Sequence, residues 1–134
     1  MLAKLRARRR ERAPAIEALR EGVVRAHDIG QLVILAFVLS CGVNVAVDLD
    51  APELAATLGG AVTDGSLASL TYLVDALLRA DRQAALDHAR AQLGPDRYDA
   101  ARATGIALSY DRIVEYTLSE LDRLLAENKQ LTGL

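Results

Sequence analysis

A run of basic side chains near the amino terminus is the feature of this sequence that most clearly indicates a kind of chemistry, namely the binding of anions. It consists of Lys4, Arg6, Arg8, Arg9, Arg10 and Arg12, with Glu11 as the one acidic residue among them. Cationic groups at this density bind the phosphates of nucleic acids or an anionic membrane surface. No aromatic residue is interleaved among them, so the run offers nothing on which bases stack. The alternative interpretation is a solvated, partly helical arm.

The net charge of −2 conceals an uneven distribution. Residues 1–27 hold eight basic and three acidic side chains, whereas residues 28–134 hold eight basic and fifteen acidic ones. The basic excess is therefore confined to the start of the chain, which is where an anionic partner could bind.

The remaining reactive residue types are too sparse to predict a catalytic or metal site. His27 and His88 have no second histidine or cysteine at ligand spacing. Cys41, the only cysteine, lies in an apolar segment, where a thiol behaves as a small buried hydrophobe. No phosphate-loop pattern and no legible set of nucleophile and base is present. We therefore expect a protein that is not an enzyme and holds no cofactor or metal.

Four residues near the carboxyl end are candidates for a pocket or an interface. Tyr98 and Tyr110 are placed to line an apolar pocket, although such tyrosines more often cap a core with the hydroxyl at its edge. Leu121 and Leu124 lie on one apolar stripe, which a protein core or a second copy of the chain would cover.

Helices must position all of these residues. Apolar side chains recur at three- and four-residue spacing, and no segment alternates with period two for long enough to form a strand. Pro14, Pro52 and Pro95 each stand where a first helical turn tolerates a missing N–H group. The expected helices cover residues 14–30, 30–47, 52–62, 66–78, 82–93, 95–103 and 109–127.

Short links between these segments predict antiparallel helical hairpins. Small residues on the helix at 52–62 (Ala55, Ala56, Gly59, Gly60 and Ala61) would let another helix approach its backbone, as in stacked helical repeats. The sequence thus predicts an all-α, tetratricopeptide-like array of about seven helices at 14–127. A basic arm at 1–13 precedes it, and a tail at 128–134 follows.

The apolar segment from Leu32 to Val47 resembles a membrane anchor in composition but not in length. Its 16 residues make a helix of about 24 Å, short of the ~30 Å of a hydrocarbon core. It also contains Ser40, Gly42 and Asn44. We therefore expect a buried helix, no membrane association, and a cytoplasmic protein. The alternative is a membrane-associated helix that follows the positively charged arm.

Two segments resemble a known family. Residues 89–118 carry Leu93-Gly94, Tyr98, Ala101, Gly105, Leu108-Ser109 and Leu118 in the pattern of a C-terminal helical signature. Residues 50–61 read DAPELAATLGGA, similar to a repeat helix of the same proteins. These are the LuxR-type and AfsR-like multi-domain bacterial transcriptional regulators, in which an NTPase module is followed by tetratricopeptide-like repeats. Arg102 departs from the pattern, since a large apolar residue is common there.

The resemblance implies the repeat portion of such a regulator, without its NTPase and DNA-binding domains. In those proteins, this portion is implied to sense a partner and relay the signal. We therefore expect a non-enzymatic interaction module that contacts either a regulator or a second copy of itself as a homodimer. Self-association is expected through the helices at 15–47 or 109–127. Two alternatives stay open, namely a nucleic-acid-associated accessory protein that uses the basic run, and a helical domain that senses a small ligand.

The basic run leads to a prediction that salt can test. If residues 4–12 contact phosphates, the affinity for duplex DNA falls steeply as salt rises, because binding releases condensed counterions. Replacing Arg8, Arg9 and Arg10 by Ala should then abolish binding in a fluorescence anisotropy titration. Binding that survives the triple replacement would place the contact elsewhere.

Overall fold

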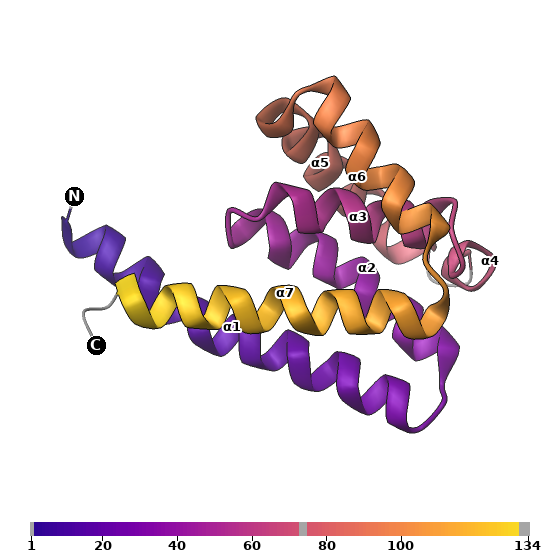
Figure 1. Ribbon diagram of the computed structural model, residues 1–134, viewed down its shortest axis with the longest axis horizontal. Coiled ribbons are helices and arrows are strands. Elements are labelled where there is room, and N and C mark those ends of the chain that lie inside the picture. The colour runs from indigo at the N-terminus through magenta and orange to yellow at the C-terminus, as the bar shows by residue number, and fades with distance from the viewer. Residues whose placement is uncertain (1, 73–74, 132–134) are drawn as a thin grey trace.

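The computed structural model describes the backbone of residues 2–72 and 75–131, and the side chains of residues 11–72 and 75–130. Over this part of the chain it contains seven helices and no strand, which confirms the all-α prediction. The helices are α1 (Leu2–Asp28), α2 (Leu32–Asp48), α3 (Pro52–Thr63), α4 (Ala68–Thr71), α5 (Asp75–Leu93), α6 (Pro95–Ala107) and α7 (Tyr110–Leu131) (Figure 1).

Helix α1 is longer than the sequence pattern predicts. The expected start at Pro14 is wrong, because α1 begins at Leu2 and runs through the proline, so that the basic run forms the first turns of the same helix. An interior proline costs roughly 3 kcal/mol of helix stability. Packing against other helices offsets this cost, because Ile16, Leu19 and Val23, which follow the proline, are buried. At the other end of the chain, α7 continues past residue 127 to Leu131.

The region between α3 and α6 also differs from expectation. Two helices were expected at 66–78 and 82–93, but the structure has the single turn of α4 and then a continuous α5. An ion pair explains the continuity, because Arg82 is almost fully buried and its Nη2 lies 2.6 Å from Oδ1 of Asp75. Residues seven apart share one helix face, so this pair ties two turns together.

Helix α3 forms the centre of the fold. Every residue from Leu54 to Val62 is buried, and the helix contacts α2, α4, α5, α6 and α7. A helix that is apolar or small on all sides is stable only when other helices surround it. The sequence of α3 meets this condition, because its one charged side chain, Glu53, lies in the first turn.

The contact of α3 with α6 is the most extensive in the molecule, and glycine makes it possible. A Cβ on Gly60 would overlap the carbonyl oxygen of Arg102, and a Cβ on Gly105 would overlap the carbonyl oxygen of Thr57. The two backbones therefore touch directly. This confirms the prediction that small residues on the third helix admit a close neighbour.

The first and last helices pair with each other. Helix α7 lies along α1 (Figure 1), where Arg20 Nε is 2.9 Å from Asp122 Oδ1 and His27 Nε2 is 2.8 Å from Asp111 Oδ1. In a stack of repeats, each unit contacts only its neighbours along the chain. A pairing that joins the two ends of the fold is of a different kind, and the tetratricopeptide-like arrangement stays a prediction.

The apolar segment that resembles a membrane anchor in composition forms helix α2. Its inward side, which includes Leu35, Leu39 and Val43, packs in the core. Among the described residues, no helix combines the length and the apolar character that crossing a bilayer requires.

Substitution at Gly105 tests the α3–α6 contact. Gly105→Ala should lower the free energy of unfolding by about 1–3 kcal/mol, because the new methyl group forces two backbones apart. The matched control is Gly22→Ala in α1, where the new Cβ meets only the two methyl groups of Val38, at 3.3 and 3.8 Å. The control should be neutral or stabilising by up to about 1 kcal/mol, as alanine favours helix. Urea unfolding followed by circular dichroism measures both, and equal effects would contradict the close contact.

Candidate interaction surface

The basic run lies mostly outside the described side chains. This applies to Lys4, Arg6, Arg8, Arg9 and Arg10, whose binding role stays a prediction. Arg12 is described, and its Nη2 donates a hydrogen bond to the carbonyl oxygen of Leu49 at 2.9 Å. Arg12 therefore ties α1 to the turn before α3, which gives it a structural role that the sequence analysis did not assign.

The two candidate pocket tyrosines are not brought together. Tyr98 lies in the first turn of α6, and Tyr110 opens α7 after the other end of α6, a helix about 20 Å long. Tyr98 is half-buried beneath the guanidinium of Arg90, and burial raises the pKa of its hydroxyl. Tyr110 is partly exposed. The two rings thus lie at opposite ends of α6, and a role for either in a pocket stays a prediction.

Leu121 and Leu124 belong to the core of the chain. Leu121 is fully buried, and 3% of Leu124 is exposed. The stripe was expected to be covered either by the core or by a second copy of the chain, and the core covers it. These side chains are therefore not accessible to a second copy while α7 is packed in place. The remaining tyrosine of the region, Tyr116, caps the core and donates from its hydroxyl to Oγ1 of Thr57 at 3.3 Å.

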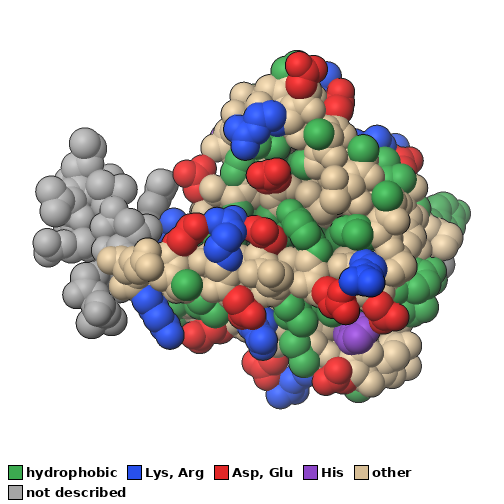
Figure 2. Space-filling view, viewed as in Figure 1, with side chains coloured by type: hydrophobic (Ala, Val, Ile, Leu, Met, Phe, Trp, Pro, Cys, Tyr) green, Lys and Arg blue, Asp and Glu red, His purple; other side chains and the backbone are tan. Residues whose placement is uncertain are grey.

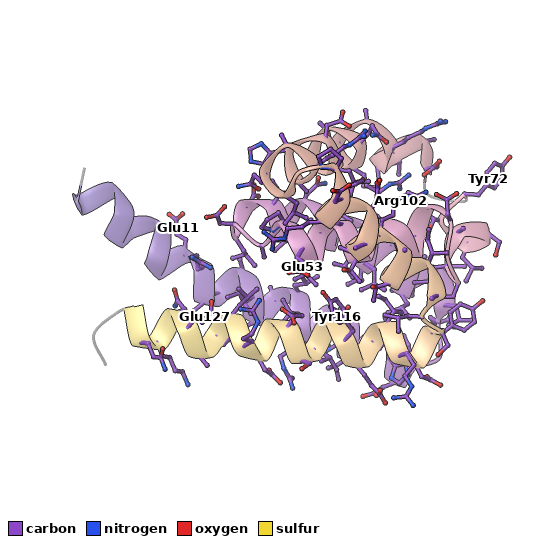
Figure 3. The ribbon with its side chains drawn as sticks, turned by 45° about the horizontal axis from the view of Figure 1, so that its top comes forward. Glu11, Glu53, Tyr72, Arg102, Tyr116 and Glu127 are labelled. Carbon is purple, nitrogen blue, oxygen red and sulfur yellow. The ribbon has the colours of Figure 1, made fainter. Side chains whose placement is uncertain are left out.

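A polar cleft of about 320 Å³ opens between the amino end of α3 and the helices α1, α6 and α7. Its charged lining residues are Arg12, Asp50, Glu53, Arg97, Arg123 and Glu127. Figure 3 shows Glu53 and Glu127 facing this region from α3 and α7. The lining thus contains three cations and three carboxylates. Arg123 forms ion pairs with Glu120 and Glu127. The cleft is thus neutral overall and offers no excess charge to an ionic ligand.

In the part of the chain that the structure describes, no three His, Cys, Asp or Glu side chains are grouped so that they could hold a metal ion. His27 pairs with Asp111 on the surface, and this contact joins α1 to α7.

Large apolar side chains are exposed at one end of the molecule. We define the apolar surface as Ile29, Leu32, Val33, Ile34 and Phe37, which are between 36% and 62% exposed. They occupy the α1–α2 turn and the first half of α2. Tyr72 and Leu77 are even more exposed on the neighbouring α4–α5 segment. Figure 2 shows apolar side chains at this end, and Figure 3 shows Tyr72 pointing into solvent there.

The outward side of α2 continues this surface without a charge. Val33, Ile34 and Phe37 are followed on the same side by Cys41 and Asn44, both partly exposed, and the first charged residue is Asp48. A helix at the surface of a globular protein normally turns charged side chains outward. Helix α2 therefore exposes a face that resembles its buried one.

Sequence reasoning named the helices at 15–47 as one place where two copies could associate, but it assigned the whole apolar segment 32–47 to the core and did not identify these exposed residues. The sequence did contain an indication of an exposed apolar face, because this helix of 17 residues has no charged residue before Asp48 and therefore no charged side to turn to solvent. Only the packing shows which of its residues remain outside.

Comparisons with family models, with curated proteins and with solved structures find no match to this chain.

The thiol of Cys41 gives a test of the α2 environment. Burial raises the pKa of Cys41, so its thiolate fraction at pH 8 is smaller than that of an ordinary cysteine. Iodoacetamide should therefore react several-fold more slowly with the folded chain than with the chain unfolded in urea. Because no other cysteine is present, mass spectrometry reads the rate without a mutant. A faster reaction in the folded protein would reveal an activated thiol.

Proposed function

We propose that this chain is a non-enzymatic helical interaction module that binds a protein through its apolar surface. The single observation that carries the proposal is the exposure of Ile29, Leu32, Val33, Ile34 and Phe37 as neighbours on one turn and one helix. Scattered apolar side chains are normal on a protein surface, whereas a contiguous group marks a binding site.

The composition of the surface suits a protein partner. Phe37 lies 40% exposed among aliphatic side chains, and an aromatic residue within an apolar patch is a typical energetic centre of an interface. Covering such groups contributes roughly 25 cal/mol for each Å² of apolar area removed from water. The polar cleft provides no comparable driving force, because its charges already neutralise one another.

A regulatory role is part of the proposal. Its support is the resemblance of residues 89–118 and 50–61 to the repeat portion of multi-domain transcriptional regulators, where such helices relay the presence of a partner. Under this interpretation, the apolar surface is where the partner or effector is sensed.

Site-specific photo-crosslinking tests the proposed function. p-Benzoylphenylalanine at position 37 should form adducts with protein in the cells that produce the chain. The matched control carries the same group at Ala84, which is exposed on α5. Adducts are expected at position 37, and few or none at position 84.

Two results would contradict the proposal. One is an absence of adducts at position 37. The other is a set of adducts at position 37 that also forms at position 84, because this would indicate random encounters. Adducts count only if adding Ile34→Asp reduces them while circular dichroism remains unchanged.

A further inference from the structure

Two of the six charged side chains that line the polar cleft have no partner of opposite charge. The other four form two ion pairs, which are Arg123 with Glu127 and, more loosely at 3.9 Å, Arg97 with Glu53. The remaining two are Arg12, from α1, and Asp50, from the turn between α2 and α3. Neither of them forms an ion pair with a described residue, and they do not pair with each other. The lining thus keeps one cation and one carboxylate without a counter-ion.

Neutral groups hold both side chains in place. Arg12 Nη2 donates to the carbonyl oxygen of Leu49, and Asp50 Oδ1 accepts a hydrogen bond from Gln92 Nε2, each at 2.9 Å. Nε of Arg12 is buried and has no hydrogen-bond partner in the described part of the chain, so its loss of water is not compensated. The second oxygen of Asp50 remains available, since this side chain is exposed.

The turn alone does not account for the carboxylate of Asp50. Its φ angle is +60°, in the left-handed region. Among the described residues, glycine occupies the other two positions of this kind, Gly30 and Gly94. Aspartate tolerates this conformation better than most residues do, but glycine adopts it without a steric cost. Glycine would therefore suit the turn at least as well as Asp50 does.

A ligand with one carboxylate and one ammonium group complements this remaining pair of charges. A guanidinium group binds a carboxylate through parallel N–H bonds, which suits Arg12 to the acidic end of the ligand. The free oxygen of Asp50 accepts from the ammonium end. Because the lining is neutral overall, such a zwitterion leaves no charge uncompensated, whereas a simple anion or cation leaves one.

The size and the walls of the cleft suit an amino acid. Its volume of about 320 Å³ is at the lower end of the range for small-molecule pockets. Beside the charged groups, the lining contains four leucine side chains, which are Leu49, Leu54, Leu93 and Leu124. An aliphatic side chain placed against them is removed from water, which favours binding.

We propose that this cleft binds a free α-amino acid with an aliphatic side chain, with its carboxylate at Arg12 and its ammonium group at Asp50. The ligand then joins α1 to the turn before α3 and stabilises the folded chain. The site is separate from the apolar surface, and the inference goes beyond the proposed function.

Thermal unfolding of the full chain, followed by circular dichroism, measures the binding. L-Leucine, L-isoleucine, L-valine and L-methionine are added singly at about 10 mM. With a dissociation constant of about 1 mM, at least one of them should raise the unfolding temperature by roughly 3–8 °C. N-Acetyl-L-leucine and L-leucinamide each lack one of the two charges and should give much smaller shifts. No shift with any of the four amino acids would overturn the proposal.

Neutralising Asp50 tests the ammonium end. Asp50→Asn keeps the size of the side chain and its tolerance of the left-handed conformation, so the chain should fold while the shift is lost. The matched control is Asp48→Asn, which removes the same charge from an exposed residue outside the lining and should retain the shift. A shift that survives Asp50→Asn, or that both variants lose, would contradict the assigned site.

Two further variants separate binding from folding. Asp50→Gly should be at least as stable as the parent chain, because glycine suits the turn, and should show no ligand-induced shift. Arg12→Gln lowers the starting stability by removing the bond to Leu49, so its shift is measured against the same variant without ligand. It should show none, whereas Arg25→Gln, on the exposed side of α1, should behave as the parent chain does. An unchanged shift in Arg12→Gln would refute the carboxylate contact.

Discussion

The direct contact between the backbones of α3 and α6 is the constraint on which the rest of the fold depends. Gly60 and Gly105 remove the side chains that would separate the two helices, so carbonyl groups of one lie against the α-carbons of the other. A contact this close leaves no room for adjustment, because protein interiors are packed as densely as organic crystals. It fixes α6 on one side of α3 and leaves the remaining sides to the other helices.

The position of α2 follows from this arrangement. With α6 seated on α3, the opposite side of α3 is covered by α2, which is itself flanked by α1 and α5. Pairing of α7 with α1 then closes the fold on that side, held by Arg20–Asp122 and His27–Asp111. None of the helices that the structure describes covers the outward face of α2. The most apolar helix of the chain is thus buried on one side only.

The two open features of the surface differ in what they offer to a partner. The cleft beside α3 is lined by three arginines and three carboxylates, among which Arg123 pairs with Glu127 and Arg97 with Glu53. The apolar surface around Phe37 is not covered by any described part of the chain. A hydrophobic driving force remains available there, which is why the proposed function is assigned to α2 rather than to the cleft.

Local patterns in the sequence determined the helices, whereas the tertiary structure decided which of their faces are exposed. Apolar spacing predicts seven helices, and the small residues of 52–62 predict a close neighbour, because both properties are set within a few residues. The start of α1 before Pro14 depended on distant contacts, among them Arg12 with Leu49, and was missed. The continuity of α5 was also missed, although its Asp75–Arg82 pair lies within one helix. The exposure of Ile34 and Phe37 was beyond local reasoning, since identical apolar residues on α2 become core or surface according to where the neighbouring helices lie.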